Sequence, residues 1–396
     1  MMKSHATWSR REFLAAVSGT GAAMILNPLT GWSIDKIDPH VAAIVAATIG
    51  IDTHNHIDVP LTTADVPGPD IDLAGEMKRS GLSAICMTFA VDYQRLQNPG
   101  DAYERFLNGL ASMDRQLTQN HMKRALNLTD IRNAHKKHQP IVIQSVEGAH
   151  FLEGHLERLT EAYNRGLQHL GLLHDNDASV PLGDVFTNPP NFGGLTAFGA
   201  DVIRKCNRLG ILVDLSHASA DTVAAALKVT KHPVLVSHTG LDTRLGQNPK
   251  MAGMMRPRLI SRENARIVAD AGGVIGVWTH LADSPLEYAV NIRALVDVVG
   301  TDHVCIGTDT KLTPPAPRPA DPGKHRDSIP GKNHQDSPEK GRVGERTNLA
   351  WKDQEAGFYY TVVEAMLKTG FTSEEIGKIG GGNFCRVFNA ATAGHH

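Results

Sequence analysis

Two kinds of hydrophobic pattern alternate along the chain. Short β-branched apolar runs predict strands, and stretches whose apolar residues repeat at helical spacing predict helices. Eight strands are expected, at 48–52, 83–91, 140–146, 169–173, 211–215, 233–236, 273–278 and 303–307. Helices are expected between them, at 73–80, 101–117, 156–165, 198–209, 220–230, 261–271 and 290–299, and after the last strand at 355–367 and 373–388.

This alternation predicts an α/β fold of the (β/α)8 TIM barrel type, built as a single domain over residues 40–396. The alternative is an open, doubly wound sheet, which usually carries a glycine-rich turn after its first strand. Here the first strand runs into Asp-Thr-His-Asn-His at 52–56, without glycines. The barrel is therefore the favoured architecture.

One segment, 313–347, departs from the alternation. It holds seven prolines among mixed charges and few apolar residues, a composition that does not suit a helix or a strand. We expect a proline-rich insert that follows the eighth strand. It either covers the mouth of the barrel as a lid or extends away from it.

Histidines and carboxylates stand at the C-terminal ends of six of the eight expected strands. In a barrel these ends meet on one face, where the active site lies. The sequence therefore predicts one polar site built from several strands. The residues are His54 and His56 on the first strand, Glu147 on the third, His174 on the fourth, His217 on the fifth, His238 on the sixth and Asp309 on the eighth.

Imidazoles with carboxylates and no thiolate suit zinc or a similar divalent ion. His54 and His56 are two residues apart, so their side chains share one face of a strand and are placed to bind one ion. His217 and His238 come from adjacent strands and are placed to bind a second. Glu147 lies between the two pairs and suits a bridging position. We expect two Zn²⁺ ions per chain.

The two remaining side chains suit the steps of amide hydrolysis. Two metals about 3.5–4 Å apart hold and activate a water for attack on a carbonyl. Asp309 is suited to move the proton from that water to the leaving amine. His174 is suited to polarise the carbonyl or to hold the oxyanion.

The chain resembles the membrane (renal) dipeptidase family, a binuclear zinc branch of the amidohydrolase-type barrels. The longest matching stretch is Asn-Arg-Leu-Gly-Ile-Leu-Val-Asp-Leu-Ser-His at 207–217, and Gly-Gly-Asn-Phe-Cys-Arg-Val-Phe at 381–388 is also specific. Shorter matches lie at 51–55, 146–148, 170–174, 193–199, 233–238 and 306–309, in the order of the family. The resemblance implies a metallo-dependent hydrolase barrel that cleaves dipeptides.

The resemblance also implies roles for individual residues. One metal would be held by the first strand with Glu147, and the other by Glu147, His217 and His238. His174 would bind the substrate, and Asp309 would transfer the proton. An arginine after the sixth strand would hold the substrate carboxylate, and Arg258 fits that place best, with Arg256 as the competitor.

The sequence departs from the family pattern at two positions. The family's first strand usually offers His-x-Asp, whereas the aligned pair here is His54-x-His56. A slipped register, His56-x-Asp58, would restore the pattern, but Ile-Asp-Thr-His at 51–54 favours the unslipped one. Lys311 stands where the family more often has an acid. Both departures bear on substrate choice and metal binding.

The N-terminal segment, 1–35, is expected to be an export signal. Arg10 and Arg11 precede an apolar run at 13–26, and no charged residue lies between Glu12 and Asp35. The run is shorter than the roughly 20 residues that span a bilayer and suits the apolar region of a signal. The arginine pair resembles the twin-arginine type, which predicts export through that machinery into the periplasm. The competing interpretation is a basic turn before a short helix.

Charge and cysteine content exclude other classes. Lys plus Arg is 40 and Asp plus Glu is 42, so no excess of positive charge would attract nucleic acid. The four cysteines lie far apart and form no Cys-x-x-Cys pair, which excludes a zinc ribbon and a disulfide framework. We expect buried free thiols.

The sequence thus predicts a periplasmic zinc dipeptidase that acts on a small dipeptide or dipeptide-like amide with a free carboxylate, and it leaves a homodimer open. One alternative is a related amide hydrolase that matures an exported, siderophore-type peptide metabolite. The other is a barrel that keeps its metals and serves as a non-catalytic binding protein.

Overall fold

The computed structural model describes residues 37–93, 95–312 and 343–395. They belong to one of two compact units, Ile37–His396. The expected export signal at 1–35 and most of the expected insert at 313–347 lie outside the described residues. No helix among the described residues combines the length and apolar character needed to cross a membrane.

The centre of the unit is a parallel sheet whose strands follow the order β8-β7-β6-β5-β4-β3-β2-β1-β9. All eight strands expected from the sequence are present, and β9 is additional. Apart from Lys311, every strand residue is buried, as expected for a parallel sheet covered on both faces. The strands are β1 Ile51–His56, β2 Ala84–Thr88, β3 Ile141–Val146, β4 Leu167–Gly171, β5 Leu212–Asp214, β6 Leu235–Thr239, β7 Val274–Val277, β8 Val304–Ile306 and β9 Thr310–Lys311.

The chain segment that contains β8 and β9 pairs with two strands that lie far apart in this order. β8 pairs with β7, and β9, which follows β8 after a short interruption, pairs with β1. Between them, the Asp309 backbone N–H donates to the carbonyl oxygen of His54 at 3.1 Å. The eighth strand therefore places Asp309 directly beside the first strand.

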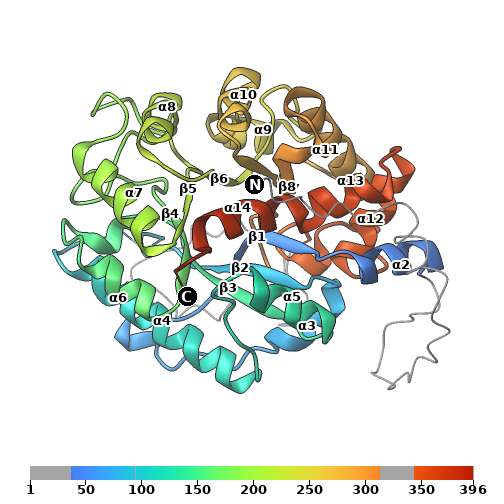
Figure 1. The fold of residues 1–396 in the computed structure, drawn as a ribbon, viewed down its shortest axis with the longest axis horizontal. Helices are drawn as coiled ribbons and strands as arrows, with labels where there is room; N and C mark the ends of the chain where they lie inside the picture. Colours follow the sequence, from blue (N-terminus) through green and yellow to red (C-terminus); the bar gives the residue numbers. More distant parts are fainter. Residues whose placement is uncertain (1–36, 94, 313–342, 396) are drawn as a thin grey trace, which may run out of the picture. The chain divides into compact units, whose positions relative to one another are not determined.

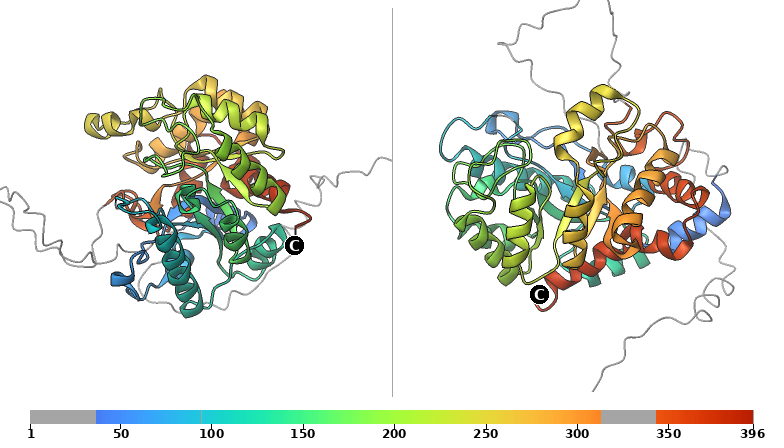
Figure 2. Two further views of the ribbon diagram at one scale, coloured as in Figure 1. Left: turned by 90° about the vertical axis from the view of Figure 1, so that its left-hand side faces the viewer. Right: turned by 90° about the horizontal axis from the view of Figure 1, so that it is seen from above.

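Helices surround the strands in chain order (Figure 1) and lie outside them in the turned views (Figure 2). Local signals set their ends. Thr196 caps the first turn of α7 through its side chain, and Thr372 and Glu375 form a capping box at α13. The helices are α2 Pro39–Ala47, α3 Leu73–Ser80, α4 Asp101–Gln119, α5 Leu128–Lys136, α6 Arg158–Asn164, α7 Ala197–Leu209, α8 Ala220–Val229, α9 Pro249–Met255, α10 Arg262–Asp270, α11 Pro285–Val299, α12 Phe358–Lys368, α13 Ser373–Gly377 and α14 Asn383–Thr392.

Helix α14 lies across the N-terminal ends of the strands, near the centre of the ring in Figure 1. Its Phe384 and Phe388 belong to a buried cluster with residues that begin strands, among them Ile51, Ala84 and Leu212. This packing fills one end of the sheet with apolar side chains. The polar strand ends therefore gather at the opposite, C-terminal end.

Several expected elements have other bounds in the structure; the helix expected at 290–299, for example, begins at Pro285. Two differences have a clear physical cause. β1 was expected at 48–52 but spans Ile51–His56, because Thr48 ends helix α2 by donating its hydroxyl to the carbonyl of Ile44. The polar residues 52–56 fit a buried strand because they bond to neighbouring strands and loops: Asp52 accepts from the Thr308 backbone N–H, and Thr53 donates to the carbonyl oxygen of Ser237. The single helix expected at 373–388 is divided into α13 and α14. A Cβ on Gly381 would lie 2.0 Å from the carbonyl oxygen of Ile49, so this close approach requires glycine.

The end of the expected insert is ordered against β9. The Lys311 backbone N–H donates to the carbonyl oxygen of Glu345 at 2.9 Å, and Lys311 pairs with Arg346 in parallel. Arg346 and Thr347 are both buried. The four cysteines are buried and free, which confirms the expectation of unpaired thiols.

Candidate active site

A pocket of about 170 Å³ lies at the C-terminal ends of the strands. Of the eight predicted site residues, seven line it: His56, Glu147, His174, His217, His238, Arg258 and Asp309. The eighth, His54, is 1% exposed and lies behind the pocket wall in contact with His56. The structure therefore brings all eight predicted side chains together.

One half of the site is built by β1 and the end of β8. The Nε2 atoms of His54 and His56 are 3.3 Å apart, so the two rings do share one face of the strand. His56 Nε2 lies 3.0 Å from Asp309 Oδ1. The Tyr93 hydroxyl lies 2.7 Å from His56 Nδ1 and 3.0 Å from its Nε2. His54, His56 and Asp309 form a group that could hold an ion.

The other half is built by β5 and β6. His217 Nε2 lies 2.9 Å from Glu147 Oε1 and 2.9 Å from His238 Nε2. His54 Nε2 lies 3.4 Å from the same oxygen, so Glu147 stands between the two halves. This is the position expected of a bridging carboxylate.

The donor set fits divalent metal ions. Five imidazole Nε2 atoms lie within 4 Å of the buried Glu147 carboxylate, those of His54, His56, His174, His217 and His238. A pair of facing nitrogen lone pairs needs a proton or a cation between them. Glu147 Oε2 is buried and has no hydrogen-bond partner among the described residues. Burial would raise the pKa of Glu147, but the surrounding His174, His54 and His217 hold that pKa well below its usual value. The carboxylate is thus ionised and available as a ligand.

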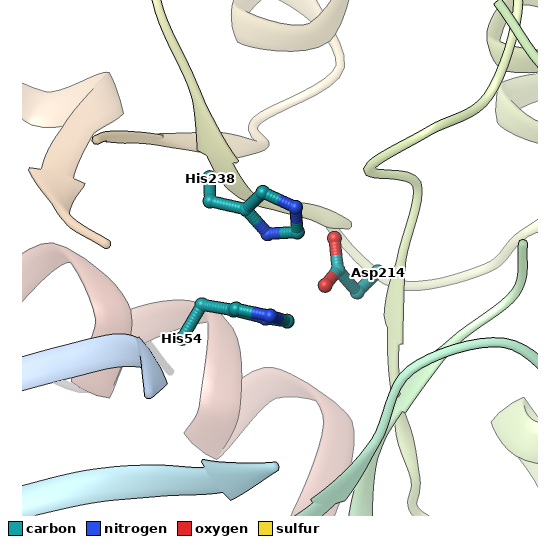
Figure 3. Close-up of side chains that lie close together, drawn as sticks. All are labelled: His54, Asp214 and His238. Carbon is teal, nitrogen blue, oxygen red and sulfur yellow. The ribbon is translucent and has the colours of Figure 1, made fainter. Parts of the chain in front are cut away.

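Asp214 lies beside His54 and His238, with its carboxylate directed toward their rings (Figure 3). Although the three side chains could hold an ion, the Asp214 oxygens already accept four hydrogen bonds. The donors are the backbone N–H and hydroxyl of Ser216 and the backbone N–H and hydroxyl of Ser237. We therefore assign Asp214 as a hydrogen-bond acceptor behind the two histidines.

His174 is oriented by a residue that the sequence analysis missed. Its Nδ1 lies 2.7 Å from Asp92 Oδ1, and Asn176 donates to the other Asp92 oxygen at 2.9 Å. Its Nε2 faces Glu147 at 3.4 Å. Asp92 therefore holds the His174 ring with Nε2 toward the pocket.

Asp309 is likewise held by a missed residue. His280 Nε2 lies 2.8 Å from Asp309 Oδ2, while Oδ1 faces His56. Asp92 follows the expected second strand, and His280 follows the expected seventh. The pattern that marked the other six strand ends, a histidine or carboxylate after an expected strand, therefore also occurs at these two.

Arg258 enters the pocket from the 3-10 turn η4, Arg256–Arg258. Its guanidinium donates to Asp175 Oδ2, and Asp175 Oδ1 lies 3.0 Å from His217 Nδ1. Arg256 is exposed and does not line the pocket. Arg258 is thus the arginine that faces the site, and the sequence analysis missed its partner, Asp175, although Asp175 directly follows His174.

Asp58 lies away from the histidines. Its carboxylate pairs with Lys311 Nζ at 2.8 Å, and both line a second cavity of about 790 Å³ next to the first. The geometry therefore favours the unslipped register, in which His54 and His56 point into the site.

Solved structures with a similar fold include an amidohydrolase from Pseudomonas aeruginosa, at 21% identity and a TM-score of 0.66 over 89% of this chain and 98% of that one. The probable dipeptidase PvdM from the same organism has 17% identity and a TM-score of 0.66 over the same shares. A metallo peptidase from Rhodobacter sphaeroides, liganded with a phosphinate mimic of the dipeptide L-Ala-D-Ala, has 17% identity and a TM-score of 0.60 over 87% and 99%. At these identities the likeness shows the fold.

An uncharacterised dipeptidase of Schizosaccharomyces pombe is 29% identical over 245 residues, which cover 59% of this chain and 54% of that protein. The match thus spans about half the length of this relative. The family model of the membrane dipeptidases matches residues 39–319, a range that contains every predicted site residue. As its sequence motifs predicted, this chain belongs to the membrane dipeptidase family, peptidase family M19.

Proposed function

We propose that this protein is a zinc-dependent dipeptidase that hydrolyses the peptide bond of small dipeptides with a free carboxylate. The observation that carries the proposal is the convergence of the Nε2 atoms of the four proposed ligands, His54, His56, His217 and His238, on the buried Glu147 carboxylate inside a pocket. Asp309 stands at the His56 end of this arrangement, and Arg258 stands at the His217 end. The two ends supply the further groups that amide hydrolysis requires.

Two zinc ions would be held by this donor set. His54 and His56 with Glu147 would hold the first, and Glu147 with His217 and His238 would hold the second. Imidazole and carboxylate ligands without thiolates suit zinc. When bound, a metal pair supplies a water of lowered pKa and polarises the amide carbonyl.

The protein's own side chains would orient the substrate and move the proton. Arg258 would bind the substrate carboxylate, because a guanidinium matches a carboxylate with two parallel hydrogen bonds. His174, held by Asp92, would donate from Nε2 to the carbonyl oxygen. Asp309, held by His280, would accept a proton from the attacking water and deliver it to the leaving amine.

The size of the pocket supports a small substrate. Its volume of about 170 Å³ is below the roughly 300–1,000 Å³ typical of sites for drug-sized ligands. We also infer that the sheet closes into a complete barrel, because one chain segment pairs with β7 through β8 and with β1 through β9.

Metal analysis combined with a substrate panel tests the proposal. The purified protein is loaded with zinc, its metal content is measured, and hydrolysis of dipeptides is compared with that of their C-terminal amides. We expect about two zinc ions per chain, cleavage of dipeptides and loss of activity with a chelator. Absence of bound zinc after loading would refute the metal centre, and equal rates on the amides would refute carboxylate recognition.

A second candidate function is hydrolysis of a larger amide, and the cavity of about 790 Å³ favours it. This cavity shares His56, Tyr93 and Asp309 with the first pocket, so a long acyl group could extend into it from the reacting carbonyl. The same panel decides between the two functions. Faster hydrolysis of N-acylated or longer peptides than of free dipeptides would select the larger substrate.

Location in the periplasm is a further part of the proposal. It is supported by the Arg10-Arg11 pair and the uncharged run that follows it. Replacing both arginines with lysine keeps the charge, so the change tests recognition by the export machinery. We expect the double variant to remain folded inside the cell, and unchanged periplasmic yield would refute the signal.

A further inference from the structure

The hydroxyl of Ser237 contacts histidines from both halves of the site. Ser237 is fully buried on β6, directly before His238. Its Oγ lies 2.9 Å from His238 Nδ1 and 3.2 Å from His54 Nδ1. It also lies 2.5 Å from Asp214 Oδ2. One oxygen atom thus connects a carboxylate to one proposed ligand of each metal.

Counting protons fixes the direction of these hydrogen bonds. A serine hydroxyl has one proton and two acceptor sites. The shortest contact is with the Asp214 carboxylate, at a length typical of a hydroxyl that donates to a charged oxygen. Because its proton is used there, Ser237 can only accept from His54 and His238. Both rings must then carry their proton on Nδ1.

Asp214 is suited to be the fixed end of this network. Its Oδ1 accepts from the backbone N–H groups of Ser216 and Ser237 at 2.9 and 3.0 Å. The Ser216 hydroxyl also donates to its Oδ1, at 2.8 Å. These donors hold the carboxylate in one orientation, so the Ser237 hydroxyl points in one direction.

We propose that Ser237 is a positioning residue that holds His54 and His238 in the tautomer that presents Nε2 to the metals. The inference rests on the proposed function only in taking the Nε2 atoms as metal ligands. Each of the other site histidines has a Nδ1 partner of its own: Tyr93 for His56, Asp92 for His174 and Asp175 for His217. Ser237 differs because it serves two rings, one in each half.

The backbone at Ser237 is fixed independently of its hydroxyl. Its carbonyl oxygen accepts from the Thr53 hydroxyl at 2.8 Å. Gly276 and Gly307 pack so closely against this carbonyl that a Cβ on either would lie 1.9 or 1.7 Å from it. Ser237→Ala should therefore fold and lose only the hydrogen bonds of the side chain.

The test compares Ser237→Ala with Ser145→Ala. Ser145 is also buried within the barrel, on β3, but its hydroxyl has no hydrogen-bond partner among the described residues. Zinc affinity is measured for both sites by competition with a chelator. We expect Ser237→Ala to weaken both sites by about 10–100-fold, as is typical when a partner of a metal ligand is removed. Ser145→Ala should leave both affinities unchanged.

A spectroscopic readout separates this role from general destabilisation. Long-range ¹H–¹⁵N NMR of the histidine rings reports which nitrogen carries the proton. In the metal-free wild-type protein, where zinc does not itself impose the tautomer, His54 and His238 should show Nδ1–H signals. Ser237→Ala should move both protons toward Nε2, and Ser237→Thr, which keeps a hydroxyl, should restore the Nδ1–H signals. Unchanged Nδ1–H signals in Ser237→Ala, or weakening of only one metal site, would overturn the proposal. If the protein binds no zinc, the proposed function fails, and the same spectra of the metal-free protein still decide the role of Ser237.

Discussion

The two halves of the site use different partners behind their histidines. In the half built by β1, the His56 ring faces the hydroxyl of Tyr93, which lies 2.7 Å from Nδ1 and 3.0 Å from Nε2, and Tyr93 is 55% exposed. In the half built by β5 and β6, His217 Nδ1 faces the Asp175 carboxylate, which Arg258 holds in turn. A carboxylate partner makes an imidazole a stronger metal ligand than a neutral hydroxyl does. In the proposed two-metal site, the β1 half would therefore hold its metal less firmly.

Glu147 is shared by both halves, so its removal should have the largest effect. Glu147→Ala leaves the site without its bridging charge, and we expect loss of both metals. Removing a single group that stabilises the developing charge costs about 10²–10³-fold in rate, so loss of both metals should lower kcat/KM by at least that factor. Metal content and kcat/KM measure the effect. Glu157→Ala, an exposed carboxylate, is the control, and retention of one tightly bound ion in Glu147→Ala would contradict the bridging position.

Arg258 belongs to the second half only. We expect Arg258→Ala to lower kcat/KM for a dipeptide. The loss of transition-state stabilisation should be about 2–4 kcal/mol, as for the loss of one partner of a charged pair. It should leave hydrolysis of the corresponding C-terminal amide much less affected. Arg256→Ala is a matched control, because this exposed arginine lies two residues away. If kcat/KM fell equally for the dipeptide and its amide, the role of Arg258 would be only to hold Asp175.

The difference between the halves can be measured directly. Titration of the zinc-loaded protein with a chelator should remove one ion at a concentration about tenfold lower than the other, within the range typical for changes in a ligand's partner. His56→Asp adds a negative charge to the β1 half and should bring the two steps together. Asp175→Asn should weaken binding of the second ion, which should also bring the two chelator concentrations closer together. A single, unresolved step in the wild-type protein would refute the comparison.

The smallest effect is expected at Asp58. In the structure this carboxylate pairs with Lys311 outside the metal group, so Asp58→Ala should keep both ions. Loss of this partly exposed ion pair should cost roughly 0–1 kcal/mol of stability. His54→Ala should lose the first ion. The reverse result in the two variants would establish the slipped register.

The sequence was sufficient for the strands and for the residues at their ends, because both depend on local patterns. Apolar runs marked β2 to β8, and the polar residues that follow such runs converge once the strands lie parallel. His54 and Glu147 could be predicted to meet for that reason. The family match then added Arg258, which lies in a loop where no periodic pattern applies.

Contacts between loops and between distant strands could not be predicted in the same way. Asp175 meets Arg258 across 83 positions of sequence, and Ser237 meets His54 across 183. Such pairs depend on side-chain directions after the strands are assembled. The displacement of β1 had a different cause, because an apolar run near Thr48 belongs to the end of a helix, whereas the buried strand is polar.

The pairing of Lys311 with Arg346 constrains how this protein could be redesigned. Lys311 and Arg346 form a parallel bridge. A tight hairpin cannot join parallel strands, which need a longer crossover connection. A design that shortens the chain between Lys311 and Arg346 must therefore keep a connection of about a dozen residues or more.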